Sequence, residues 1–179
     1  MRNFPFDENK AVATVLFILQ ERGKIGRHEL FKILYFADQK HLAQYGRPVI
    51  GDRYIAMKNG PVPSKIYDAI KSVAEPSSMY SFELFDSAIK TSNIFIEAKL
   101  GPDMDELSKS DITCLLESIK ENSGLSFHQL TDKSHGLAWQ KACTNNDISV
   151  KLMAREAGAD IEMEAYIKEK LEDIRLAQA

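Results

Sequence analysis

The sequence predicts an α+β fold that is mostly α: a compact helical domain around one central helix, with small β-hairpins attached. Apolar residues recur at helical spacing over much of the chain. Glycine and proline separate these segments from short runs of β-branched and aromatic residues. The 179 residues, with 44% hydrophobic and 27% charged side chains, are typical of one folded domain.

The first two helices are expected at residues 8–21 and 27–45. Asp7 is a suitable N-cap for the first helix, which glycines after residue 22 end. In the second helix, apolar side chains occupy more than one side, and Asp38 and His41 lie within the main apolar arc. This helix is therefore predicted to be central and to pack on at least two neighbours.

A turn-rich region follows the central helix. Gly46-Arg47-Pro48 predicts a left-handed glycine cap followed by a proline stop. Residues 49–57 have strand composition, and Asn59–Pro63 combines a turn signal with prolines that keep the chain extended. Ser64 is expected to cap a third helix at residues 65–73.

The second half of the chain reads as shorter elements. We expect a hairpin of strands at 80–85 and 93–99 with a long connection. Helices are expected at 112–122, started by Ser110-Asp111, from Ser126 in a capping box with Gln129, and at 160–177. A short turn at 134–136 precedes the segment 137–143, which contains the single tryptophan. The last helix carries a stripe of Met163, Ile167, Leu171 and Ile174. The stripe either folds back as the last core helix or is presented to a partner groove.

Composition excludes several classes of protein. No apolar run reaches the length of about 18 residues that spans a bilayer, and the N-terminus lacks a signal-peptide pattern. Cys114 and Cys143 form neither a disulfide framework nor a metal spacing, which indicates a reducing compartment and a cytoplasmic protein. The four histidines also lack ligand spacing, and no phosphate-binding loop is present, so no metal and no cofactor are predicted.

Charge is unevenly distributed. Residues 1–75 hold 12 Lys/Arg against 8 Asp/Glu, whereas residues 76–179 hold 11 against 18. Seven basic side chains follow the central helix and turn: Arg27, Lys32, Lys40, Arg47, Arg53, Lys58 and Lys65. Two helices, a hairpin and a further helix are also compatible with a winged-helix-like DNA-binding regulator that acts on operator DNA. Against this alternative, the second helix is too apolar to lie exposed in a DNA groove.

Asp38, His41 and Tyr45 lie one turn apart on one helical face. A carboxylate, an imidazole and a phenol in this order are candidates for acid–base catalysis. The other interpretation is a polar cluster that binds nearby backbone, because buried polar groups need partners. No nucleophile or metal pattern accompanies them, so an enzyme is not expected.

One segment resembles a known family. It contains Lys32-Ile33-Leu34-Tyr35-Phe36-Ala37-Asp38, then His41, Tyr45-Gly46-Arg47-Pro48, Gly51-Asp52-Arg53-Tyr54, Met57 and Gly60-Pro61-Val62-Pro63-Ser64. In residue order and spacing it resembles the Panacea domain, also called the SocA-like antitoxin domain. A weaker similarity includes Leu130-Thr131, Ser134-His135 and Ala138-Trp139.

The resemblance implies a bacterial or phage antitoxin that neutralises a cognate toxin by direct protein contact. One branch of the family delivers its toxin to the ClpXP protease, so this protease is a further implied partner. The resemblance implies a Panacea domain at residues 1–146 and a C-terminal helical extension at 147–179. The oligomeric state stays open, a homo-oligomer included. The candidate site residues, as partner contacts or as structural motif, are Tyr35, Asp38, His41, Arg47, Gly51, Asp52, Tyr54, Lys58, Gly60, Pro61 and Pro63.

Overall fold

A computed structural model of the protein describes residues 3–75, 82–92 and 94–177. The helices in these ranges are α1 (Glu8–Arg22), α2 (Arg27–Tyr45), α3 (Ser64–Ala74), α4 (Glu83–Ala88), α5 (Lys109–Asn122), α6 (Phe127–Ser134), α7 (Leu137–Lys141), α8 (Val150–Glu156), α9 (Ile161–Ala177) and the short 3-10 helix η1 (Met104–Glu106). The strands are β1 (Ile25–Gly26), β2 (Tyr54–Met57), β3 (Gly60–Pro63), β4 (Ile89–Thr91) and β5 (Phe95–Ala98). The predicted α+β, mostly α class is confirmed.

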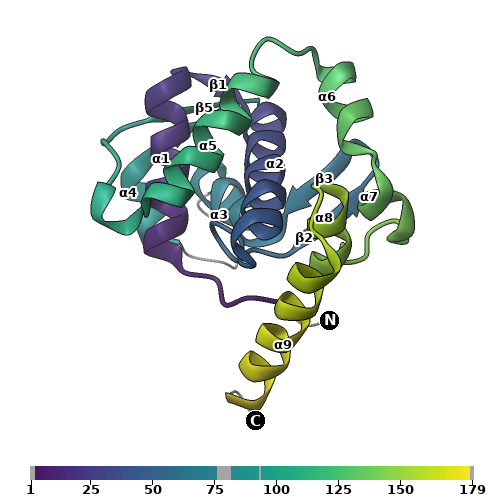
Figure 1. Cartoon of the computed structure of the whole chain (residues 1–179). Coiled ribbons are helices and arrows are strands. Elements are labelled where there is room, and N and C mark those ends of the chain that lie inside the picture. Colours follow the sequence, from purple (N-terminus) through teal and green to yellow (C-terminus); the bar gives the residue numbers. More distant parts are fainter. Residues whose placement is uncertain (1–2, 76–81, 93, 178–179) are drawn as a thin grey trace.

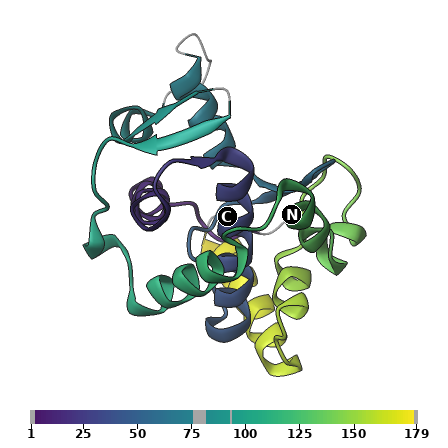
Figure 2. The ribbon, with the colours of Figure 1, turned by 90° about the horizontal axis from the view of Figure 1, so that it is seen from above.

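Helix α2 lies at the centre of the molecule, with other elements on several sides (Figures 1 and 2). Every residue from Leu30 to Gln39 is buried. Helix α5 packs along α2, while α6, α8 and the β2–β3 hairpin contact it elsewhere. The prediction of a central helix with at least two neighbours is confirmed, because a helix that is apolar on more than one side is stable only when it is covered on more than one side.

Side chains of α2 enter two hydrophobic clusters. The larger cluster joins α2 to α1, α3, α4, α5 and the three-stranded sheet. The smaller one joins Tyr35, Phe36 and Leu42 to side chains of β2, α7, α8 and α9. The C-terminal helices therefore pack against the same helix that carries the N-terminal sequence motif.

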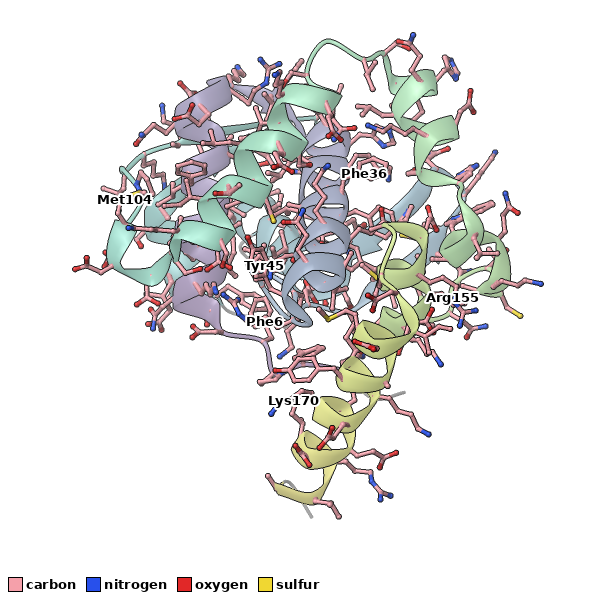
Figure 3. All side chains as sticks on the ribbon, in the orientation of Figure 1. Phe6, Phe36, Tyr45, Met104, Arg155 and Lys170 are labelled. Carbon is pink, nitrogen blue, oxygen red and sulfur yellow. The ribbon has the colours of Figure 1, made fainter. Side chains whose placement is uncertain are left out.

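Helix α9 folds onto this smaller cluster and then extends away from the body of the protein (Figure 1). Ile167 and Leu171 of the predicted stripe are buried, so the core-helix alternative holds for these two residues. Arg155 of α8 (labelled in Figure 3) binds Glu164 of α9 through two hydrogen bonds of 2.6 and 2.7 Å. Helix α8 has no counterpart among the predicted helices, because seven residues are too few for a helical period to stand out.

The predicted strand at 80–85 is wrong where the structure describes it. Residues 80–81 lie outside the described residues, and Glu83–Ala88 forms α4. Phe85 and Ala88 are both buried while Leu84 is exposed, and such a three-residue spacing suits a helix and not an alternating strand. The strand predicted at 93–99 is confirmed as β5, although residue 93 lies outside the described residues.

The sheet partners of β5 also differ from the prediction. Strand β5 pairs antiparallel with β4, which precedes it closely in sequence, so the expected long connection is wrong. On its other side β5 pairs with β1, the two residues between α1 and α2. This three-stranded sheet therefore ties the second half of the chain to the α1–α2 turn.

The strand predicted at 49–57 is confirmed only over Tyr54–Met57, which is β2. Strand β2 pairs with β3 in antiparallel register. Residues 49–53 stay out of the ladder because their backbone amides at positions 49 and 50 bind a side chain of α2. The edge of β2 that faces away from β3 binds a later segment of the chain. The amide of Ala56 donates to the carbonyl of Asn146 at 2.9 Å, and the amide of Ile148 donates to the carbonyl of Tyr54 at 2.8 Å.

The predicted helix ends are mostly confirmed. Asp7 caps α1, Gly46 ends α2 with φ of 70°, and Ser126 forms the expected capping box. The expected start of α5 at residue 112 is wrong: the helix begins at Lys109, three residues earlier, Ser108 is its N-cap, and Asp111 completes a capping box with it.

Candidate functional site

Asp38 is the polar centre of the motif. Its side chain is buried on α2, and Oδ1 accepts hydrogen bonds from the amides of Val49 (2.7 Å) and Ile50 (3.3 Å). Its Oδ2 accepts a hydrogen bond of 2.9 Å from the hydroxyl of Tyr54. We call these four residues the Asp38 cluster. It fixes both the turn after α2 and the first residue of β2 to the central helix.

Burial dominates the electrostatics of the Asp38 cluster. It raises the pKa of Asp38 to about 7, although the three hydrogen-bond donors oppose this shift. Burial and the neighbouring Asp38 raise the pKa of Tyr54 well above its ordinary value. The ring of Tyr35 packs edge-on against Tyr54 at 5.2 Å between centroids, and its hydroxyl accepts a hydrogen bond from Gln39. Tyr35 thus packs beside the cluster, and its hydroxyl hydrogen-bonds along α2.

His41 belongs to a second polar cluster. Its Nδ1 lies 2.7 Å from the carbonyl oxygen of Arg47, and its Nε2 lies 3.0 Å from Ser110 Oγ and 3.1 Å from Asp111 Oδ1. Asp111 also binds Arg47 at 3.0 Å and Lys10 at 2.8 Å. Burial alone would raise the pKa of Asp111, but hydrogen bonds from His41, Lys10 and Ser108 hold it well below its usual range. This cluster joins α1, α2, the following turn and α5.

The two clusters differ from the arrangement of a serine triad. The hydrogen-bond partners of Asp38 and His41 are different, although the two residues lie one turn apart. In a serine triad the serine and the carboxylate bind opposite ring nitrogens, whereas Ser110 and Asp111 both lie at Nε2. Tyr45 (labelled in Figure 3) is 45% exposed. Its ring centroid lies 4.7 Å from that of His41, with 40° between the two ring planes. The geometry of Asp38 and His41 favours the structural interpretation.

Asp52 caps helix α3 from a distance in sequence. Its carboxylate accepts hydrogen bonds from the amides of Lys65 (3.1 Å) and Ile66 (3.0 Å), and burial raises its pKa. The prediction that Ser64 is the cap is wrong: α3 begins at Ser64, and no side-chain cap comes from the preceding Pro63. A buried carboxylate already satisfies the amides that a local cap would bind.

Replacement of Asp52 by alanine is expected to lower the free energy of unfolding by about 1–2 kcal/mol, because it removes a helix cap and leaves two amides without an acceptor. Urea denaturation measures this loss. Asp68→Ala, within the same helix, is the matched control and should change stability by less than about 0.5 kcal/mol. Equal effects of the two substitutions would refute the capping role.

Two glycines of the motif allow close approach of other chain segments. Gly51 has φ of +67°, and a Cβ there would collide with the carbonyl oxygen of Pro5. Gly60 has φ of +95°, and a Cβ there would collide with Ser134 Oγ. Both positions need glycine for conformation and for space. Their role is therefore to shape the backbone.

Lys32 lies beneath the hairpin. Its side chain is fully buried, and its ammonium donates a hydrogen bond of 2.9 Å to the carbonyl of Pro61. Burial lowers the pKa of Lys32 to about 7. From the other side, Trp139 donates to the carbonyl of Met57 at 3.0 Å and stacks on His135 at 3.6 Å. The N-terminal and C-terminal parts of the motif therefore meet at the β2–β3 hairpin.

Most of the candidate residues are inaccessible to a partner. Nine of the eleven are buried, namely Tyr35, Asp38, His41, Gly51, Asp52, Tyr54, Gly60, Pro61 and Pro63, whereas Arg47 is partly exposed and Lys58 is exposed.

Sequence reasoning missed Asp111, which binds His41, Arg47 and Lys10. The spacing of Ser108 and Asp111 is a capping-box pattern, and this pattern is the signal in the sequence that points to Asp111.

The basic residues do not form a free positive face. Lys32 is buried, and Lys40, Arg47 and Arg53 bind carboxylates from the second half of the chain at 2.7, 3.0 and 3.4 Å. Arg27 donates hydrogen bonds to Ser92 and its neighbour. Helix α2 is buried at every residue from Leu30 to Gln39 and is not free to enter a DNA groove. These observations do not favour the DNA-binding alternative.

Metal ligands, membrane-spanning helices and cysteines would each indicate another kind of site in the part of the chain that the structure describes. Over residues 3–75, 82–92 and 94–177, no three His, Cys, Asp or Glu side chains converge as metal ligands. In the same part of the chain, no helix combines the length and apolar character needed to cross a membrane. Cys114 is buried on α5 and Cys143 is exposed, and both are free thiols.

Comparison with known proteins gives one result. No curated protein and no solved structure matches significantly. The family described as antitoxin SocA-like, Panacea domain matches residues 30–140, which run from α2 into α7 and include both parts of the motif. Since this match covers more than half of the chain, the protein belongs to the SocA-like antitoxin, Panacea domain family.

Proposed function

We propose that this protein is the antitoxin of a bacterial or phage toxin–antitoxin pair and neutralises its cognate toxin by direct contact in the cytoplasm. Membership of the SocA-like antitoxin family is the observation that carries this proposal. The proposed action is non-catalytic: the toxin is bound, and no bond is made or broken.

The burial of the motif supports this mode of action. Asp38, Asp52 and Asp111 are buried, and each binds backbone or side-chain groups of the protein itself. Such contacts rigidify a scaffold, and a rigid scaffold pays little conformational entropy when its surface binds a partner. The motif would thus hold the frame, and the toxin would bind residues outside the motif.

The proposal predicts rescue in a co-expression experiment. Induction of the small open reading frame beside the gene should stop growth of a heterologous host, and co-expression of this protein should restore colony formation. Complex formation between the two purified proteins checks that contact is direct. Failure to rescue growth from the product of any flanking gene would contradict the antitoxin function.

Direct contact allows two mechanisms of neutralisation, which the same assay distinguishes. In one, the antitoxin masks the toxin surface; in the other, it delivers the toxin to ClpXP. Rescue that persists in a host without ClpXP, with a stable toxin, indicates masking. Rescue that requires ClpXP, with a toxin whose half-life shortens only when the antitoxin is present, indicates delivery.

A further inference from the structure

Residues of α1, α4 and the segment 100–106 line a groove. Helices α1 and α4 lie on the side of the molecule away from the C-terminal helices (Figure 1). Its cavity volume is about 210 Å³. The apolar part of its lining includes Val12 and Leu16 of α1, Leu84 of α4, and Leu100. None of the lining residues belongs to the sequence motif, which is instead buried around α2.

Large apolar side chains at the groove are open to solvent. Leu84 is 41% exposed and Leu100 is 56% exposed. Met104 lies four residues after Leu100 and is 43% exposed. It is on the opposite side of the molecule from Arg155 (Figure 3). Grouped exposed apolar side chains beside a concave surface are typical of a binding site for another protein.

The rim of the groove carries more acidic than basic side chains. Asp103 and Glu106 line it, and Glu83, Asp86 and Asp105 flank it in sequence, as does Lys99, whose ammonium donates a hydrogen bond of 2.6 Å to the backbone carbonyl of Asp86. Within the described residues none of these five carboxylates makes an ion pair, whereas Asp111, Glu121 and Glu164 all do. No Lys or Arg lines the groove. The rim is therefore complementary to positive charge on a partner.

We infer that this groove binds an amphipathic segment of a partner protein, in which aliphatic side chains fill the cavity and flanking Lys or Arg face the acidic rim. Because the inference rests on the proposed antitoxin function, the partner is the toxin. The cavity is smaller than the roughly 300–1,000 Å³ of small-molecule clefts and suits one or two protruding side chains. A second copy docked by two-fold symmetry would bring two acidic rims together, which disfavours self-association.

A model peptide tests the groove without knowledge of the toxin. A fluorescein-labelled helical peptide of leucine and lysine should bind the full-length protein, with an affinity that falls as salt is added, and a leucine–glutamate peptide should not. The doubly substituted Leu84→Lys/Leu100→Lys protein should bind the first peptide at least about tenfold more weakly. Fluorescence anisotropy measures each dissociation constant.

Leu116→Lys/Leu176→Lys is the matched control, since it adds the same charge at leucines that are 42% and 67% exposed on α5 and α9. It should retain the wild-type affinity to within about twofold. Equal weakening of both variants would mean that net charge alone governs binding and would overturn the inference. An unchanged affinity in the groove variant would also overturn it.

Two further readouts separate the groove from the proposed function. If the wild-type protein is a dimer by light scattering and the groove variant is a monomer, the occupant is a second copy and the inference fails. In the growth assay, rescue by the wild type and the control variant but not by the groove variant supports the inference. Rescue by all three places the toxin contact elsewhere while the antitoxin function stands. Absence of rescue by the wild type rejects the antitoxin function, and the peptide affinities still decide whether the groove binds as inferred.

Discussion

Replacement of Asp38 by alanine is expected to destabilise the protein by about 3–5 kcal/mol, because three buried donors lose their acceptor at once. The amides of Val49 and Ile50 and the hydroxyl of Tyr54 all bind this one carboxylate. A loss of this size is a large part of the total stability of an ordinary domain. Urea denaturation of purified wild type and variant measures it.

Milder substitutions calibrate this result. Asp38→Asn keeps one carbonyl oxygen for the two amides and should cost less than Asp38→Ala. Tyr54→Phe removes a single hydrogen bond and should cost about 1 kcal/mol. If Asp38→Ala instead kept wild-type stability and lost toxin neutralisation, the carboxylate would be a contact or a catalytic group, and the structural interpretation would be wrong.

Lys32 should make stability depend on pH above neutrality. Burial lowers the pKa of Lys32 from 10.5 to about 7, so between these values the unfolded chain holds a proton that the folded chain does not. The free energy of unfolding therefore rises with pH in this window, by up to about 1.4 kcal/mol per pH unit, and the contribution is flat below pH 7. Urea denaturation at several pH values from 7 to 10 measures the slope.

Lys32→Met removes the charge while it keeps most of the side-chain volume. This variant should lose the rise attributed to Lys32, and at pH 7 its stability should equal or exceed that of the wild type, because no charge is buried. Lys120→Met, at an exposed position on α5, should retain the wild-type slope. Identical slopes in the wild type and in Lys32→Met would show that the buried ammonium stays charged throughout this range.

Local sequence signals were sufficient where the structure is built from local contacts. The central position of α2 follows from apolar residues on more than one of its faces, and its end follows from Gly46-Arg47-Pro48. Asp7 and the Ser126–Gln129 box lie within three residues of the amides that they bind. For the caps and for the end of α2 the stabilising partner is close in sequence, so the pattern contains the information.

Local signals failed where a distant partner decides the conformation. Residues 49–53 have strand composition, but the carboxylate of Asp38 takes two of their backbone amides. Ser64 is a good local cap, but Asp52 already binds the amides at the start of α3. The segment around Phe85 has β-like composition, but it forms a helix that buries Phe85 and Ala88 in the core.

The sequence by itself determined the mostly α class, the central helix and, through the motif around Asp38 and Gly60, the antitoxin family. Only the tertiary structure decided that most of this motif is buried scaffold and that an open acidic groove lies elsewhere. The groove draws its lining from α1 and, far from α1 along the chain, from α4 and residues 100–106. No local pattern records such a surface, because it exists only after these three segments have packed together.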